Sequence, residues 1–298
     1  MNKTKGILFS VIAASIFGFV AAVSPIAYQG GFNPVTLALM RQLVNLPLAL
    51  IIMLVNKTPL KLKSDQTVKL SALGIFGWAA TILTLNTAYT LVDVGICTTI
   101  HFTYPIFVTL GCVLIYKVRI GRVKIMALAV STLGIVALVL GGTGSSSNAT
   151  GGIFLALVSG VTYAFYMLFL DKSNLASQMS PVKVIFYVGL SGCSVLALYG
   201  LLTGQLNFSG IEPKYWLMVV GIGILGGLVG FSLVQLGIKH TDATTTSICS
   251  TCEPVTSVLF GILLLGEQFT VMKLIASVLI IAGVLMLSLI KEKKKPSV

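Results

Sequence analysis

The chain repeats one pattern in its two halves, and this duplication restricts its fold more than any other feature. When residues 93–140 are placed on residues 242–289 at a constant offset of 149, apolar residues coincide at most positions. Identical residues also coincide, among them Asp93 with Asp242, Pro105 with Pro254, Lys124 with Lys273, Ala127 with Ala276 and Gly134 with Gly283. The chain is therefore expected to contain two structurally similar units.

The composition places both units in a membrane. Hydrophobic residues make up 56% of the chain and charged residues only 9%, whereas about a quarter of the residues of a soluble domain are charged. Apolar windows of about 18 residues or more, long enough to cross roughly 30 Å of hydrocarbon, recur along the chain. We predict an all-α polytopic membrane protein with ten transmembrane helices at about 6–27, 34–55, 68–90, 94–116, 122–141, 151–170, 182–203, 214–237, 244–265 and 270–290.

Each unit then contains five helices, and this odd number has a consequence for orientation. The second unit must enter the membrane upside down relative to the first, as in the inverted repeats of many secondary transporters. The predicted domains are a first five-helix repeat at 1–141, a flexible extracytoplasmic linker at 142–151 and a second, inverted repeat at 152–298 that ends in a basic cytoplasmic tail.

The net charge of +12 is interpreted as a topology signal rather than as a sign of nucleic-acid binding. If the N-terminus is cytoplasmic and ten helices alternate, all but three of the 20 basic residues lie on the cytoplasmic side. The exceptions are Lys214 and Lys273, on the outer side, and Arg41, inside the membrane. This asymmetry follows the positive-inside rule, so both termini are predicted to be cytoplasmic.

Three ionisable side chains lie well inside predicted helices: Arg41, His101 and Glu253. A charged group in the bilayer interior costs at least about 2.5–3.5 kcal/mol, which makes each a candidate functional residue. Arg41 and His101 lie about 10 Å from the outer start of their helices, and we expect Arg41 to direct its charge outward to water as an anchor. Glu253 lies near the midplane, where a carboxylate must be protonated, paired or hydrated.

Two prolines occupy equivalent positions in the repeats and are predicted to break their helices. Pro105 cannot donate to the carbonyl of His101, and Pro254 cannot donate to that of Ser250. In a membrane, such a freed carbonyl is tolerated only against protein or a water-filled cavity. Matched interruptions in two repeats therefore indicate a central binding site.

Aromatic and amide side chains add weaker candidates. Trp78, Tyr104 and Tyr163 fall near mid-helix rather than in the interfacial belts where Trp and Tyr are common. Asn86 and Gln235 are related by the offset of 149, and we expect them to hydrogen-bond across the interface between the repeats.

An enzymatic alternative depends on Cys249 and Cys252, which form a CxxC motif beside Glu253. A membrane thiol oxidoreductase would also need an exposed cysteine pair, and the predicted loops contain none. The sequence has no GxSxG or HExxH motif, no set of four zinc ligands and no Walker loop. We predict no catalytic residue, metal or cofactor; a polytopic membrane enzyme, either an intramembrane hydrolase or a thiol oxidoreductase, is kept as the alternative to a transporter.

The second repeat resembles a known family. Glu253-Pro254-Val255, followed by Leu265-Gly266-Glu267 and Gly283-Val284, resembles the EamA-type transporters of the drug/metabolite transporter superfamily, the ten-helix type. A degenerate first-repeat version consists of Tyr104-Pro105, Lys117-Val118-Arg119 and Gly134-Ile135. Val118 stands where the family's first repeat often has Glu, so an acidic residue at this position is not expected to be essential here.

The resemblance implies a fold, an activity and a site. It implies two inverted five-helix repeats around a central cavity, and export of amino acids or similar small polar metabolites across the bacterial cytoplasmic (inner) membrane by alternating access. Carried over by position, Pro105 and Pro254 would be the helix breaks, and His101, Tyr104, Ser250, Glu253, Trp78 and Tyr163 would face the substrate. Asn86 and Gln235 complete the predicted substrate-binding set.

The predicted partners are a small-molecule substrate and the lipid bilayer, not nucleic acid. His101 can change charge near neutral pH, and Glu253 could do so in an apolar site. Either could exchange a proton for substrate, but facilitated movement without a proton is equally compatible. The oligomeric state, monomer or dimer, stays open.

Overall fold

The computed structural model describes residues 2–92, 94–140, 149–266 and 268–288, and all regular secondary structure in these ranges is helical. The first half contains α1 (Lys3–Gln29), α2 (Pro34–Leu43), α3 (Asn45–Val55), α4 (Ser64–Ala72), η1 (Leu73–Ala79), α5 (Ala80–Tyr89), α6 (Val94–His101), α7 (Tyr104–Leu114) and α8 (Arg122–Leu140). The second half contains α9 (Ala149–Lys172), α10 (Leu175–Gln178), α11 (Pro181–Leu202), α12 (Pro213–Gly223), η2 (Ile224–Gly230), α13 (Phe231–His240), α14 (Ala243–Ser250), α15 (Cys252–Leu265) and α16 (Val271–Ser288). Asp93, residues 141–148, which include most of the linker expected at 142–151, and the basic tail after Ser288 lie outside the described residues.

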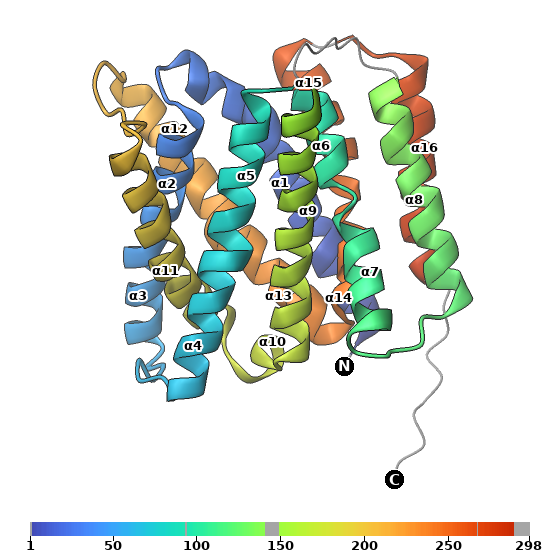
Figure 1. Cartoon of the computed structure of the whole chain (residues 1–298), viewed down its shortest axis with the longest axis horizontal. Coiled ribbons are helices and arrows are strands. Elements are labelled where there is room, and N and C mark those ends of the chain that lie inside the picture. Colours follow the sequence, from blue (N-terminus) through green and yellow to red (C-terminus); the bar gives the residue numbers. More distant parts are fainter. Residues whose placement is uncertain (1, 93, 141–148, 267, 289–298) are drawn as a thin grey trace.

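Nine helical stretches of the described residues are long and apolar enough to cross a membrane. Several of them join consecutive elements: α2 with α3, α4 with η1 and α5, α6 with α7, α12 with η2 and α13, and α14 with α15. The 19-residue α8 occupies the place of a tenth predicted span and packs lengthwise against α16 (Figure 1). The chain is therefore an all-α polytopic membrane protein, and this prediction is confirmed.

The two repeats run in opposite directions through the bundle. In Figure 1, α1 begins at the lower end of the molecule, whereas α9, its counterpart in the second repeat, begins at the upper end. Likewise α8 begins at the lower end and α16 at the upper end, so Lys124 and Lys273 lie at opposite ends of the molecule. The predicted inversion of the second repeat is confirmed.

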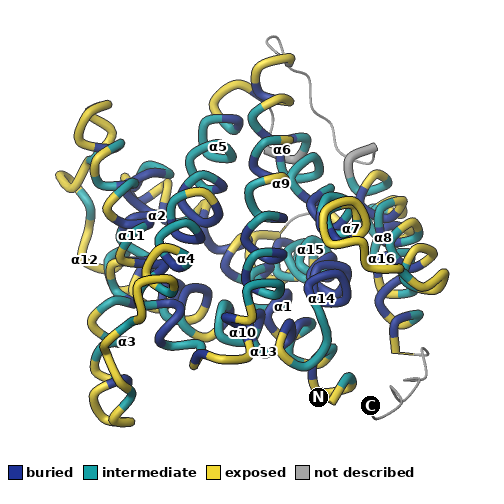
Figure 2. The backbone as a smooth tube through the Cα atoms, turned by 60° about the horizontal axis from the view of Figure 1, so that its bottom comes forward, coloured by how far each residue is buried: buried dark blue, intermediate teal, exposed yellow. Residues whose placement is uncertain are grey.

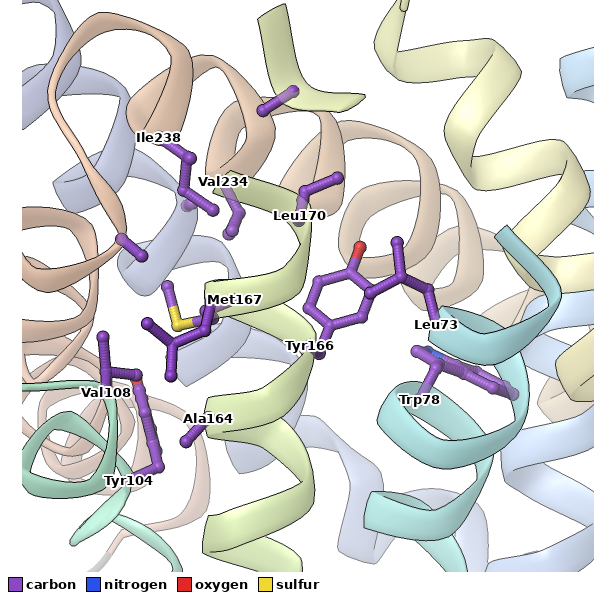
Figure 3. Packing of buried hydrophobic residues seen from close by; sticks show 14 of the residues in the cluster. Leu73, Trp78, Tyr104, Val108, Ala164, Tyr166, Met167, Leu170, Val234 and Ile238 are labelled. Atoms are coloured by element: carbon purple, nitrogen blue, oxygen red, sulfur yellow. The ribbon is translucent and has the colours of Figure 1, made fainter. Parts of the chain in front are cut away.

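The core lies where α1, α9, α13 and α14 meet. Every residue of α14 is buried, as Figure 2 shows near the centre of the bundle. Tyr166 and Met167 are buried on two sides of α9. Tyr166 lies on the side of Leu73 and Trp78, and Met167 lies on the side of Tyr104 (Figure 3). Large apolar side chains on the outer faces are instead exposed, as expected where lipid is the solvent: Leu54, Leu114, Leu202, Leu217 and Val271.

Two π-helical segments interrupt membrane helices, and they occupy matching places in the repeats. The segment η1 lies between α4 and α5, and η2 lies between α12 and α13. The hydropathy pattern had predicted continuous helices there, because it does not distinguish i→i+5 from i→i+4 hydrogen bonding. π-Helical turns are rare and occur frequently at functional sites, and both segments here border the cavity described below.

The helices that contain Pro105 and Pro254 are interrupted just before each proline. The helix α6 ends at His101 and α7 begins at Tyr104, while α14 ends at Ser250 and α15 begins at Cys252. Each proline therefore lies in the first turn of the following helix. Backbone N–H groups in a first turn have no acceptor within the helix, so the missing N–H of proline costs no hydrogen bond there. The interruptions place helix ends in the middle of the bundle.

Candidate substrate cavity

A cavity of about 250 Å³ lies between the two repeats. Its walls come from α1, α2, η1, α5 and α6 of the first repeat and from α9, η2, α13 and α15 of the second. The lining extends from Tyr28 and Pro34, where α1 ends and α2 begins, to Trp78 and Glu253 in the middle of the bundle. The cavity therefore reaches the middle of the molecule from the end opposite to the start of α1.

Glu253 lines the cavity because its helix is interrupted beside it. It lies in the first turn of α15, two residues after the break at Thr251. The Oγ1 of Thr256 lies 2.9 Å from the carbonyl oxygen of Glu253 and 3.3 Å from that of Ala14 in α1, so the start of α15 packs against α1. The backbone of Glu253 is thus held beside α1, and its side chain is only partly buried.

His101 lines the cavity from the end of α6, and a hydroxyl orients its ring. Its Nδ1 lies 3.0 Å from the Oγ of Ser159, which in turn donates to the carbonyl of Ala156 at 2.6 Å. Since a serine hydroxyl has one hydrogen, Nδ1 of His101 must be the donor to Ser159. In the neutral ring this leaves Nε2 as a hydrogen-bond acceptor.

Aromatic rings surround His101 and form one wall of the site. The rings of Tyr104 and Tyr163 lie 5.5 and 5.6 Å from the imidazole, and they contact each other edge to face at 4.8 Å. Tyr163 and Trp78 line the cavity, whereas Tyr104 does not. Tyr104 is buried in the core beside the cavity.

Asn86 and Gln235 do not hydrogen-bond to each other, so this expectation was wrong. Asn86 lines the cavity and donates to the carbonyl of Pro34 at 3.3 Å. Gln235 is buried and donates to the carbonyl of Met179 at 2.9 Å. The physical reason is the inversion itself: equivalent residues near the ends of equivalent helices lie at opposite ends of the molecule.

Ser250 also lies away from the cavity. Its side chain is buried at the end of α14, where the hydroxyl donates to the carbonyl of Thr246 at 3.0 Å. The offset of 149 pairs Ser250 with His101 and Glu253 with Tyr104. In each pair only one member lines the cavity, so the wall is chemically asymmetric although the repeats are related.

Arg41 is the cavity residue for which the sequence suggested a different role. It was expected to anchor α2 at the outer surface, but its side chain is partly buried and lines the same cavity as Glu253. The sequence did indicate that Arg41 could share a site with His101, because both were predicted at the same depth in the membrane. What the sequence did not contain was the rotation of α2 about its axis.

Neither thiol chemistry nor metal binding is indicated by the described residues. The side chains of Cys249 and Cys252 are buried, and both are free thiols. Within the described ranges, no group of three or more His, Cys, Asp or Glu residues is arranged to hold a metal ion.

Comparison with known proteins identifies the family. The family model described as "EamA-like transporter family" matches residues 4–140 and matches again over residues 150–289. The chain belongs to the EamA-like transporter family. An uncharacterised transporter of Clostridium kluyveri is 28% identical over 94% of this chain and 91% of its own length. The uncharacterised transporter YcbK of Bacillus subtilis is 24% identical over 92% of this chain and 89% of its own.

A solved structure shares the fold of this EamA-like protein. A crystal structure superimposes with a TM-score of 0.82 at 18% identity, covering 95% of this chain and 98% of the other. At this identity the match supports the architecture alone. With the family match, it shows that the chain is a multi-pass membrane transporter built from two copies of one helical unit.

At the end of this EamA-like transporter opposite to the cavity mouth, an ion pair joins the two repeats. The ammonium of Lys124, in α8, lies 2.6 Å from the carboxylate of Asp242, which precedes α14. Asp242 also caps α14 by accepting from the backbone N–H of Thr245 at 2.8 Å. Burial alone would raise the pKa of Asp242, but Lys124 and the Thr245 hydrogen bonds outweigh it and hold this pKa below its ordinary value.

Proposed function

We propose that the protein is a secondary transporter that exports amino acids or similar small polar metabolites across a bacterial cytoplasmic membrane by alternating access. The observation that carries the proposal is the cavity between the inverted repeats, which both repeats line. In transporters of this construction, the substrate binds near the midplane, where discontinuous helices meet. Here the interruptions of α6–α7 and α14–α15 lie beside His101 and Glu253.

The size and lining of the cavity support a small polar substrate. Its volume of about 250 Å³ is just below the roughly 300–1,000 Å³ typical of sites for drug-sized ligands. Arg41, Asn86, His101 and Glu253 offer charged and hydrogen-bonding groups, whereas Phe17, Trp78, Tyr163 and Phe231 offer apolar contact. An amino acid has both kinds of surface.

The direction in which the cavity faces supports one state of an alternating-access cycle. With the N-terminus in the cytoplasm, as the positive-inside rule favours, the cavity faces the outer side and the Lys124–Asp242 pair closes the cytoplasmic side. Opening the cytoplasmic side would require this pair to separate. Since nucleotide-binding motifs are missing from the sequence, a solute gradient is proposed as the driving force.

Counterflow in liposomes tests the proposed function. Purified protein is reconstituted into vesicles loaded with a pool of unlabelled amino acids, and uptake of labelled L-amino acids is measured. Ala38→Trp places a bulky ring in the cavity and should abolish counterflow. The matched control Leu54→Trp adds the same ring to an exposed position on α3 and should leave it intact. Equal counterflow in both variants would contradict the proposal.

Proton coupling is tested separately from transport. His101 and Glu253 are the cavity groups that could exchange a proton for substrate. If a proton is coupled, an imposed pH gradient should drive accumulation of labelled substrate against its own gradient. If counterflow persists but a pH gradient drives no accumulation, the transporter is a facilitator.

The enzymatic alternative is not favoured by the site. Cys249 and Cys252 are buried in the helix break, and neither lines the cavity. A thiol relay needs access to an electron carrier, which these positions do not offer. Replacing both by Ser should therefore leave counterflow within about twofold of that of the unaltered protein.

A further inference from the structure

Arg41 and Glu253 bring ionisable groups of opposite sign to one cavity from the two repeats. Arg41 belongs to α2 of the first repeat, and Glu253 belongs to α15 of the second. Both side chains line the same space. They do not form an ion pair with each other, since no salt bridge within 4.0 Å involves either residue in the described part of the chain.

The position of Arg41 is fixed by close packing of α2 against the glycine face of α12 and η2. A Cβ atom added at Gly223 would lie 2.8 Å from the carbonyl oxygen of Arg41, and one added at Gly226 would lie 3.1 Å from its guanidinium. Asn45, one turn further along, donates to the same carbonyl at 2.8 Å. The backbone of Arg41 is therefore held from two directions, and its side chain is directed into the cavity.

A charge in this position is costly unless an opposite charge joins it. An ionisable group inside the membrane loses hydration, and its cost is offset by a partner or by water in a cavity. Arg41 and Glu253 lie in a common space but do not neutralise each other directly. Such an arrangement leaves room between them for a molecule that carries both charges.

We propose that Arg41 binds the carboxylate of the substrate, that Glu253 binds its ammonium group, and that the cavity thereby selects zwitterions. This inference rests on the proposed transport function and assigns the residues that determine its specificity. The guanidinium offers a planar fork that matches a carboxylate in two hydrogen bonds. Arg41 lies nearer the cavity mouth and Glu253 nearer the midplane, so the substrate is oriented with its carboxylate outward.

Competition with matched analogues tests the assignment. Counterflow of labelled L-serine, L-leucine and L-phenylalanine identifies the best-transported amino acid. Its amide, which lacks the carboxylate, and its α-hydroxy acid, which lacks the amine, are then used as competitors. In the unaltered protein both analogues should compete at least about tenfold more weakly than the amino acid, because each leaves one charge of the cavity unpaired.

Two substitutions should change this selectivity in opposite ways. In Arg41→Gln the preference for the amino acid over its amide should fall at least about tenfold, while the preference over the hydroxy acid persists. Glu253→Gln should show the reverse. Arg41→Lys keeps the charge but lacks the fork, so it should fold and show an intermediate loss. The control Lys214→Gln removes an exposed cation at the outer end of α12 and should change neither preference.

A binding measurement separates this inference from the transport function. Trp78 lines the cavity and Trp216 does not, so in a Trp216→Phe background the fluorescence reports Trp78 alone. Propionate should perturb this signal, and Arg41→Gln should weaken its binding at least about tenfold. If no amino acid is transported but propionate binding still depends on Arg41, the proposed transport function is wrong and the role of Arg41 in carboxylate binding is supported. If propionate does not bind, or if Arg41→Gln leaves binding and selectivity unchanged, the inference is wrong.

Discussion

Arg41, His101 and Glu253 are placed in the cavity by backbone geometry rather than by ion pairs with one another. Arg41 is held by the packing of α2, His101 ends α6 and is oriented by Ser159, and Glu253 follows the break between α14 and α15. None of the three supports the core through a side-chain salt bridge among the described residues. Isosteric replacement of these side chains should therefore alter ligand handling more than folding.

Glu253→Gln tests whether this carboxyl group carries a proton. The amide has nearly the same shape but cannot exchange a proton, so the response of transport to a pH gradient should disappear. Counterflow should be weaker, because the charge that binds the ammonium group is gone, and should continue at a raised substrate concentration. Initial rates at several pH values, with and without a gradient, measure the effect. The control Glu212→Gln removes an exposed carboxylate that pairs with Lys214 outside the cavity. An unaltered pH response in Glu253→Gln excludes Glu253 as the proton carrier.

At the scale of elements, the cavity depends on interrupted helices and on one close helix contact. The breaks before Pro105 and Pro254 and the segments η1 and η2 all occur where helices border the cavity. Interruptions leave backbone groups that a regular helix would have paired, and in a membrane these need protein or water as partners. The regular outer pair, α8 and α16, contains no such interruption.

The contact between η2 and α3 predicts a strong difference between two glycines of one span. A Cβ atom at Gly227 would lie 1.9 Å from the side-chain nitrogen of Asn45, whereas nothing lies within 4 Å of one at Gly221. Gly227→Leu should therefore overpack the interface and destabilise the protein by about 1–3 kcal/mol or more. Gly221→Leu, which faces outward, should be tolerated. The thermal unfolding midpoints in detergent compare the two, and equal midpoints would refute this packing.

The Lys124–Asp242 pair predicts which substitution opens the end of the molecule opposite to the cavity mouth. Asp242→Asn removes the charge that joins α8 to α14, so buried Cys249 should react faster with a maleimide added from that side. Asp65→Asn breaks an exposed pair within α4 and is the matched control. If Cys249 reacts equally fast in both variants, the ion pair does not contribute to closure.

The lowered pKa of Asp242 also predicts the response of this closure to pH. A carboxyl group whose pKa is depressed in the folded protein contributes its full stabilisation above its ordinary pKa of about 3.9. The contribution is lost only as the pH falls through the lower pKa of the folded state. Protection of Cys249 should therefore stay constant between about pH 8 and 5, once the rate is corrected for thiol ionisation. A marked loss of protection in that range would contradict the ion pair.

At the scale of the whole molecule, the architecture could be predicted from the sequence because it depends on averages over many residues. Apolar windows and the offset of 149 indicated the spans and their inversion without any knowledge of packing. The prolines indicated the interruptions because a missing N–H acts on the backbone locally. These features do not depend on how one helix is rotated against another.

The cavity wall was less predictable because it depends on helix rotation. Tyr104 and Ser250 are close in sequence to lining residues, yet their side chains are directed into the core. Arg41 has the opposite outcome, because the glycines of α12 and η2 allow α2 to approach and direct it inward. The contacts that orient α2 join residues about 180 positions apart, and no local pattern in the sequence contains them.

The most direct test of this account is the accessibility of one cavity position from the two sides of the membrane. In a variant in which all five cysteines are replaced by Ser, Ala38→Cys places a thiol in the cavity wall. An impermeant maleimide should label this thiol from the outer side and, during substrate exchange, from the cytoplasmic side as well, and bound substrate should slow both reactions. Labelling from one side only under all conditions, or labelling that substrate does not affect, would contradict a cavity that two inverted repeats open alternately.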